Sequence, residues 1–274
     1  MPEGKIVKGY ILPGLPHLVF GEKVGRWAEL RRAFQAVGKA IRDAKPDVVV
    51  VFSTQWISGL GHLFQALPNP KGIHVDENWH HLGEIPFDFR VDADLARKAV
   101  EAAGAHGLQA RAVDYEGFPV DTGTLVVAYF LGGDHSIPLA CVSCNIYAGR
   151  DDELALGRAT AEAIRQSGRR AVVVACTGLS GHFFTQEIEP EKDRMSSDED
   201  DQWNRRLLDL MAQGKNAEAV EAAGDFAGAT GADMGFKAFY WLMGALGTPS
   251  IPGKLLAYGP LWGTGAAVVE YDLG

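Results

Sequence analysis

The sequence predicts a single α/β domain in which a central, mostly parallel mixed sheet is flanked by helices. Residues 45–53 (KPDVVVVFS) and 169–178 (RRAVVVACTG) are continuous apolar, β-branched runs, and such runs are typical of parallel strands covered on both faces. A helical pattern precedes each run, so the same strand–helix–strand unit occurs twice. No Pro/Ser-rich linker or short repeat divides the chain, and we expect residues 1–274 to form one domain.

The first helix is expected after an apolar N-terminal strand and a turn. The run YILPGLPHLVFGE, residues 10–22, leads out of the strand. Apolar residues then recur at steps of three and four positions, the pattern of a helix that buries one face. They are Val24, Trp27, Leu30, Phe34, Val37 and Ile41. Together with the run at residues 45–53, this helix completes the first crossover unit.

The second half of the chain continues with helices and closes with strands. A helix is expected over residues 151–166, because its first turn carries the acidic sequence DDE, which is favourable at a helix N-terminus. Ser196 and Glu199 have the spacing of a capping box and predict a further helix start. A helix rich in aromatic residues is expected at 234–246, and two strands, KLLAYG and GTGAAVVEYDL, end the fold. The glycines of WGTGAA predict a turn between these two strands.

The charge balance argues against nucleic-acid and membrane partners. The chain has 26 Lys+Arg against 35 Asp+Glu and a net charge of −9, which repels phosphate backbones and anionic lipids. No apolar run approaches the roughly 20 residues that span a bilayer. The N-terminus, MPEGKIVKGY, also lacks the apolar core of a signal peptide. We therefore expect a cytoplasmic protein.

The three cysteines predict no disulfide framework, because their number is odd and the chain is long enough to form a core without one. Cys141 and Cys144 have C-x-x-C spacing. However, they lie in an apolar run that predicts a buried strand, where a three-residue offset places the two side chains on opposite faces. We expect two small core residues rather than a zinc or redox pair.

The eight histidines give little support for a metal site. A non-haem Fe(II) site commonly needs two imidazoles and one carboxylate, and in an α/β sheet such ligands belong at the carboxyl ends of strands. Of the candidate strand ends, the first carries His17, the second carries Gln55 where an imidazole would be needed, and the third carries His182. The sequence has no nucleophile elbow, phosphate-binding loop or HExxH motif.

Several runs nevertheless resemble the class III extradiol dioxygenases, which have the LigB-like fold. The likeness covers nearly the whole chain in the right order and is strongest to alpha-type subunits of the members that open aminophenol rings. The runs are ILPGLPHLVFGE, PDVVVVFSTQWISGLGH, GIHVDENWHHLGE, FPVDTGT, GLSGHFFTQEIEPEKDR, DEDDQWNRRLLDLM, MGFKAFYWLMGAL and YGPLWGTGAAVVEYDL. In catalytic members, the resemblance implies an Fe(II) held by two histidines and a glutamate, with a further histidine as acid/base.

Carried over residue by residue, the resemblance implies that the catalytic positions are vestigial. The two ligand histidines fall at Gly14 and Gln55, the acid/base histidine at Gly181, and the glutamate at Lys254. Glycine cannot coordinate a metal, the glutamine amide is a weak ligand, and an ammonium group repels Fe(II). We therefore expect no catalytic residue, no cofactor and no metal in this chain. The residual pocket candidates are His17, His62 and His182, each expected to be hydrogen-bonded in a pocket or core.

The resemblance then implies a structural, non-catalytic alpha-type subunit. Its expected partner is a paralogous beta-type subunit that carries Fe(II), in an α2β2 heterotetramer that opens 2-aminophenol-type rings with O2 to a 2-aminomuconate semialdehyde. Asp121 is expected to start a helix. The loop HVDENWHHLGE, within the long irregular segment 69–89, is expected to be a subunit contact or an exposed rim.

Two other functions remain open from the sequence. One is an autonomous metal-dependent extradiol dioxygenase with displaced ligands, in which His17 and His62 pair with Glu77 or Glu270, or in which His182 replaces the acid/base. The other is a stand-alone protein that binds a small molecule in the emptied pocket.

Overall fold

The central sheet of the protein has eight strands in the order β6-β3-β7-β2-β8-β1-β10-β9. The structure is a computed structural model and describes residues 3–21, 25–132, 135–248 and 250–274. The neighbouring strands β7, β2, β8 and β1 are parallel, whereas β10 and β9 are antiparallel additions at one edge. The strands are β1 Lys5–Leu12, β2 Val48–Ser58, β3 His62–Gln65, β6 Ala110–Val113, β7 Leu139–Asn145, β8 Arg170–Cys176, β9 Lys254–Leu261 and β10 Thr264–Asp272.

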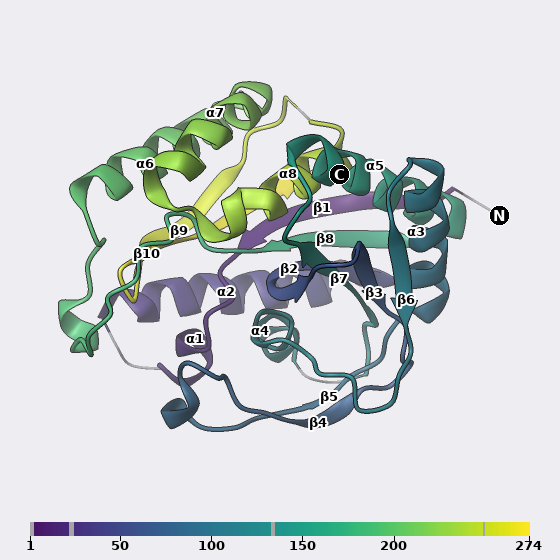
Figure 1. The fold of residues 1–274 in the computed structure, drawn as a ribbon, viewed down its shortest axis with the longest axis horizontal. Coiled ribbons are helices and arrows are strands. Elements are labelled where there is room, and N and C mark those ends of the chain that lie inside the picture. The colour runs from purple at the N-terminus through teal and green to yellow at the C-terminus, as the bar shows by residue number, and fades with distance from the viewer. Residues whose placement is uncertain (1–2, 22–24, 133–134, 249) are drawn as a thin grey trace.

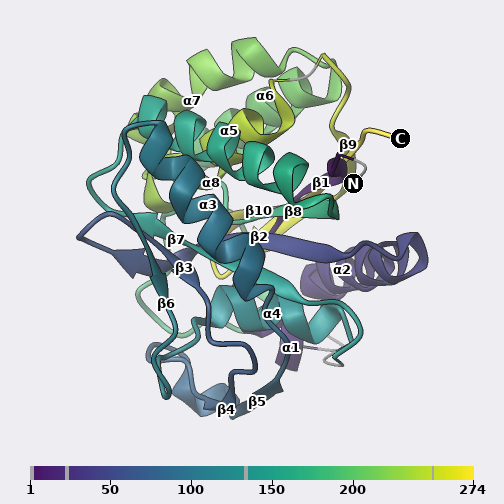
Figure 2. The same ribbon diagram turned by 90° about the vertical axis from the view of Figure 1, so that its right-hand side faces the viewer.

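Helices cover both faces of this sheet (Figures 1 and 2). One face packs against α1, α2 and α4, and the other against α3, α5 and α8, with α6 and α7 beyond the latter. The expected α/β fold with a mostly parallel sheet is therefore confirmed. The helices are α1 His17–Phe20, α2 Gly25–Ala44, α3 Ala93–Ala105, α4 Thr122–Phe130, α5 Arg150–Ser167, α6 Asp198–Ala212, α7 Asn216–Thr230 and α8 Lys237–Leu246.

The core is divided into two apolar clusters by the sheet, because successive side chains of a strand point to opposite faces. Cys141 belongs to the cluster under α2 and α4, and Cys144 to the cluster under α3, α5 and α8. Burial raises the thiol pKa of both residues. The prediction that these cysteines are core residues on opposite faces is confirmed.

The segment 69–89 is more ordered than its sequence predicts. It contains a two-stranded hairpin, β4 Lys71–His74 and β5 Ile85–Asp88, with a 3-10 turn, η1 His80–Leu82, between the strands. The hairpin lies apart from the main sheet, beside α4 (Figure 2). Ile85, which follows the loop HVDENWHHLGE, is buried in the apolar cluster that includes residues of α4. Within the loop itself every residue except Asp76 is half-buried or exposed, and its role as a subunit contact stays a prediction.

The start of α6 is capped one residue later than expected. Ser197, rather than Ser196, is the N-cap, and its hydroxyl accepts a hydrogen bond from the backbone N–H of Asp200. The hydroxyl of Ser196 instead donates to the backbone carbonyl of His182. No helix among the described residues is long and apolar enough to span a bilayer.

Glu153, in the first turn of α5, is a fully buried acid whose two carboxyl oxygens have no hydrogen-bond partner among the described residues. Burial raises the pKa of this carboxyl well above its usual value. Such a group stabilises the fold only while protonated, so its contribution is present below the unfolded pKa and is lost as the pH rises through the folded pKa.

We expect Glu153→Gln to be more stable than the parent at pH 8, by about 1–3 kcal/mol, because the variant avoids ionising a buried group. The gain should shrink at pH 5, where the parent carboxyl is closer to full protonation. Urea unfolding of both proteins between pH 5 and 8 measures this. A gain that is constant across the range would show that the Glu153 carboxyl does not titrate with a raised pKa.

Candidate functional site

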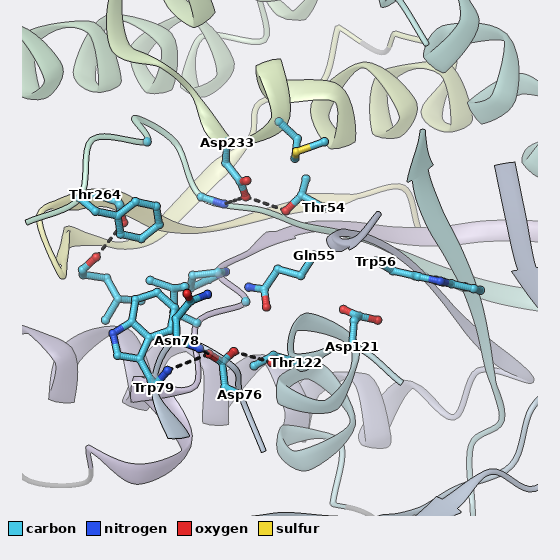
Figure 3. Close-up of a pocket in the computed structure, with 18 of the residues that line it drawn as sticks. Thr54, Gln55, Trp56, Asp76, Asn78, Trp79, Asp121, Thr122, Asp233 and Thr264 are labelled. Atoms are coloured by element: carbon cyan, nitrogen blue, oxygen red, sulfur yellow. Dashed lines mark hydrogen bonds between the residues drawn. The ribbon is translucent and has the colours of Figure 1, made fainter. Parts of the chain in front are cut away.

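A cavity of about 770 Å³ lies at the carboxyl ends of β1, β2 and β8. Its floor is formed by residues 13–15 and 54–57, which follow or end these strands. Residues 74–79, between β4 and η1, form one wall, and Asp233 and Met234 form another. Figure 3 shows that side chains from these segments converge on Gln55. Ligands of open α/β sheets bind at the carboxyl ends of the strands, so this cavity is the candidate functional site.

Asp233 brings a carboxylate to one side of the cavity. Its Oδ2 atom accepts hydrogen bonds from the hydroxyl of Thr54 at 2.6 Å, the hydroxyl of Thr177 at 3.2 Å and the backbone N–H of Gly178 at 2.9 Å. Burial raises the pKa of this carboxyl, and the three hydrogen bonds act in the opposite direction. Asp233 therefore ties the segment between α7 and α8 to the ends of β2 and β8.

Asp121 stands on the opposite side of Gln55 (Figure 3). It is the N-cap of α4, and its Oδ1 atom accepts from the backbone N–H of Thr124 at 2.9 Å and from the hydroxyl of Ser53 at 2.5 Å. The prediction that Asp121 starts a helix is confirmed. Its position also places a carboxylate at the cavity.

A chain of hydrogen bonds joins the loop 74–79 to the start of α4. The hydroxyl of Thr122 donates to Oδ2 of Asp76 at 2.6 Å, and Nε2 of His74 lies 2.7 Å from the same hydroxyl oxygen. Because the hydroxyl proton is committed to Asp76, Nε2 of His74 must be the donor in the second bond. Oδ1 of Asp76 also accepts from the backbone N–H groups of Asn78 and Trp79. The loop is thus a fixed cavity wall.

Three of the four vestigial positions inferred from the sequence line this one cavity. Gly14, Gln55 and Gly181 contribute to its surface. Lys254 does not, and its expected placement is wrong. It begins β9 with an exposed side chain, whereas the cavity meets β9 at Leu261, seven residues or about 23 Å further along the strand.

Among the carboxylates that line the cavity, Asp233 is one for which the sequence predicted no role. A signal was present, because Asp233 lies in the short connection between Gly231, the left-handed residue that ends α7, and the apolar, aromatic helix α8. Asp233 begins the 3-10 turn Asp233–Phe236 in this connection. Recognising Asp233 required knowing that α7 and α8 meet over β2 and β8.

Both glycines at vestigial positions are enclosed. A Cβ atom on Gly14 would lie 2.8 Å from Sγ of Cys176 and 2.9 Å from Nε2 of Gln55. A Cβ atom on Gly181 would overlap the backbone carbonyl oxygen of Gly231. A larger residue at either position therefore requires the surrounding atoms to move.

The three histidines that the sequence suggested as pocket candidates do not line the cavity. His17 is enclosed by the rings of Trp27, Trp79 and Trp262, with ring centroids 4.9–5.1 Å away. Neither of its ring nitrogens has a hydrogen-bond partner among the described residues, so the expectation of a hydrogen-bonded histidine is wrong. Burial lowers the pKa of His17 to about 4.

His62 and His182 lie elsewhere. His62 is buried at the start of β3, its Nδ1 atom has no partner among the described residues, and burial lowers its pKa to about 4. His182 is half-exposed and pairs through Nδ1 with the buried carboxylate of Asp200 at 3.0 Å. A shift of His182 into the cavity would break this hydrogen bond.

The cavity does not fit an Fe(II) site with two imidazoles and one carboxylate. His74 is the one imidazole among the described lining residues, and it bonds to Thr122. Within the described parts of the chain, no group of three His, Cys, Asp or Glu side chains is arranged to hold a metal. The displaced ligand set suggested by the sequence is not assembled either, because Glu270 bonds to Lys8 and Tyr10 on β1.

A comparison with protein families decides the relationship. The family model described as the catalytic LigB subunit of aromatic ring-opening dioxygenase matches residues 13–269. The chain belongs to this family. The match begins at the residues that follow β1 and ends within β10, so it includes every segment that lines the cavity.

Two curated relatives from Pseudomonas sp. align with nearly the whole length of this LigB-family chain. It is 40% identical to a 2-aminophenol 1,6-dioxygenase alpha subunit over 274 residues, covering 98% of this chain and 99% of the relative. It is also 32% identical to a 2-aminophenol 1,6-dioxygenase beta subunit over 292 aligned residues, covering 100% of this chain and 96% of the relative.

A solved structure shows that the LigB-family fold extends to a distant protein. The crystal structure of an uncharacterized protein from Escherichia coli K12 superposes with a TM-score of 0.68, covering 97% of this chain and 100% of the other. The two sequences are 16% identical. The likeness therefore concerns the fold alone.

Proposed function

We propose that this chain is a structural, non-catalytic alpha-type subunit of an extradiol dioxygenase that opens 2-aminophenol-type rings. Its partner is a paralogous beta-type subunit that holds the Fe(II), in an α2β2 assembly. The observation that carries the proposal is the cavity lining, where glycines stand at positions 14 and 181. A Cβ atom at position 181 would overlap the carbonyl oxygen of Gly231, and one at position 14 would crowd Cys176 and Gln55.

The similarity to named alpha and beta subunits supports the same function. The chain is more similar to the alpha subunit, at 40% identity, than to the beta subunit, at 32%. Two paralogous chains of one fold can divide the work, so that one performs the chemistry and the other completes the assembly. A chain in that second role needs its surface and its fold rather than its metal ligands.

An exposed apolar patch offers a contact surface for the partner. It consists of Ile57, Leu60, Ile146 and Tyr147, which are 57%, 75%, 41% and 80% exposed. The four residues lie together, because the backbone N–H of Ile146 donates to the carbonyl of Ser58 and the ends of β2 and β7 are paired. Exposed apolar groups of this kind mark protein interfaces. The patch adjoins the cavity through Ile57.

Co-expression with the paralogous subunit tests the proposal. We expect the two chains to co-elute as one complex in size-exclusion chromatography. After anaerobic Fe(II) loading, the iron content of the complex should equal one iron per beta-type chain and none per chain of this protein. Leu60→Asp should weaken co-elution at least about tenfold, because it buries a charge in the interface. Tyr115→Asp, at an equally exposed residue outside the patch, is the matched control and should leave co-elution intact.

The autonomous-enzyme alternative has a different outcome. It requires one tightly held iron per isolated chain and ring opening without the paralogue. Either result would overturn the assignment of a non-catalytic subunit. A pull-down in which the paralogue does not bind the folded chain would overturn the proposed assembly.

A further inference from the structure

The cavity has the dimensions and walls of a small-molecule site. Its volume of about 770 Å³ lies within the range of natural ligand pockets. Trp56, Trp79 and Phe183 contribute aromatic surface, and Leu15 and Val120 contribute aliphatic surface. Because such walls favour a flat apolar body, the shape of the cavity is suited to an aromatic ring.

The charge of the lining is one-sided. Four of the described lining residues are acidic, and none is lysine or arginine. The acidic residues are Asp76, Glu77, Asp121 and Asp233. A cleft lined by one sign of charge and walled by low-dielectric groups concentrates ligands of the opposite sign. Anionic aromatic molecules are therefore disfavoured.

Two carboxylates keep an oxygen without a hydrogen bond. The three donors that reach Asp233 all bind Oδ2, and Oδ1 accepts no hydrogen bond from the described residues. The two donors that reach Asp121, from Ser53 and Thr124, both bind Oδ1. Oδ2 of Asp121 likewise accepts no hydrogen bond from the described residues. Figure 3 places these carboxylates on opposite sides of Gln55.

Asp233 is the stronger anchor of the two. Asp121 caps α4, so the positive end of a helix dipole already compensates its charge. Asp233 accepts three hydrogen bonds, and its partners within the described parts of the chain include no basic side chain. A buried carboxylate in this situation gains most from a cation that donates to its free oxygen.

We infer that the cavity binds an aromatic molecule carrying an alkylammonium group, with the ammonium donating to Oδ1 of Asp233 and the ring against Trp56 or Trp79. The aromatic faces add a cation–π attraction. The aliphatic amine is essential, because an amine attached directly to a ring is largely uncharged at neutral pH. This ligand class therefore differs from aminophenols, and the inference holds whether or not the chain assembles with a paralogue.

Isothermal titration with three probes of one shape tests the inference. Tyramine carries the ammonium, 4-ethylphenol is its neutral analogue and 4-hydroxyphenylacetate is its anionic analogue. We expect tyramine to bind at least about tenfold more tightly than 4-ethylphenol, as one charge-assisted hydrogen bond provides. The anion should bind most weakly. The full chain is used, in whichever assembly it purifies.

Asp233→Asn should remove the tyramine preference and leave the affinity for 4-ethylphenol within about twofold, because the amide retains an acceptor oxygen but not the charge. Asp198→Asn, at an exposed residue in the first turn of α6, is the matched control and should change neither. Circular dichroism checks that each variant is folded.

Equal or tighter binding of 4-ethylphenol or of the anion by the parent protein would overturn the inference. So would the absence of tyramine binding at about 1 mM, or a tyramine preference that survives in folded Asp233→Asn. If that variant does not fold, the comparison of the three probes on the parent protein still decides the outcome.

Discussion

Gly181→Ala is expected to lower the free energy of unfolding by about 3 kcal/mol, because a single methyl group at this position has no space. The methyl would overlap the carbonyl oxygen of Gly231. The two backbones are tied together, since the N–H of Gly181 donates to Thr230 and the N–H of Asp233 donates to Leu179. Relief of the overlap must therefore break these bonds or displace Asp233 from the cavity.

Urea unfolding of Gly181→Ala measures the effect, with Gly224→Ala as the control. Gly224 lies on the exposed side of α7, and a Cβ atom there would meet nothing within 4 Å. This variant should be neutral or more stable by about 0.5–1 kcal/mol, because alanine favours a helix over glycine. A Gly181→Ala protein as stable as the parent would mean that the contact between α7 and the end of β8 is looser than described.

The close approach of Gly181 to the carbonyl of Gly231 also limits which side chain position 181 can carry. Histidine at position 181, where the resemblance to the family places an acid/base group, would meet the carbonyl of Gly231 before its ring reached the cavity. Gly14 is less restricted, because its two nearest obstacles are the side-chain ends of Cys176 and Gln55, and the nearest backbone atom, Cα of Gly123, lies 3.1 Å from the added Cβ atom. Histidine substitutions at positions 14 and 181 are therefore not expected by themselves to create a catalytic site of the family's type.

Asp193→Ala is expected to destabilise the protein by about 4 kcal/mol, because it leaves three buried donors without an acceptor. The carboxylate of Asp193 accepts from Nε1 of Trp27 at 2.7 Å, from the N–H of Trp262 at 2.7 Å and from the N–H of Gly263 at 3.0 Å. Trp262 and Gly263 form the two-residue turn between β9 and β10, both with positive φ, of 56° and 86°. A tryptophan in this conformation needs external support.

Thermal and urea unfolding measure the loss in Asp193→Ala. Asp193→Asn should lose less, since its amide keeps one acceptor oxygen for part of the donor set. The exposed Asp198→Ala should stay within about 0.5 kcal/mol of the parent. Equal stability of the alanine and asparagine variants would show that packing, rather than the lost acceptors, determines the role of Asp193.

Local patterns in the sequence determined most of the fold. The apolar runs at β2 and β8 required strands buried on both faces, and the three-and-four spacing required the helix that became α2. The strand ends also located part of the site, because carboxyl ends of parallel strands meet at one edge of a sheet. Gln55 was found in this way, whereas Gly14 was placed by the resemblance to the family.

Lys254 was misplaced because strand direction is a tertiary property. The strand β10 is antiparallel to β1, and β9 is antiparallel to β10. The end of β9 that reaches the cavity is therefore its carboxyl end, at Leu261, and Lys254 lies at the opposite edge of the sheet. The local sequence around Lys254 does not encode the direction of β9, so it does not indicate which end of that strand faces the site.

Long-range packing decided the remaining features of the site. Asp233 became the cavity carboxylate because α7 and α8 meet over the ends of β2 and β8, and His17 became enclosed because three tryptophans from separate segments surround it. Sequence periodicity reports which side of an element is buried, but not which distant element covers it. The sequence by itself therefore determined the sheet and its helices, whereas only the tertiary structure decided which polar groups occupy the cavity.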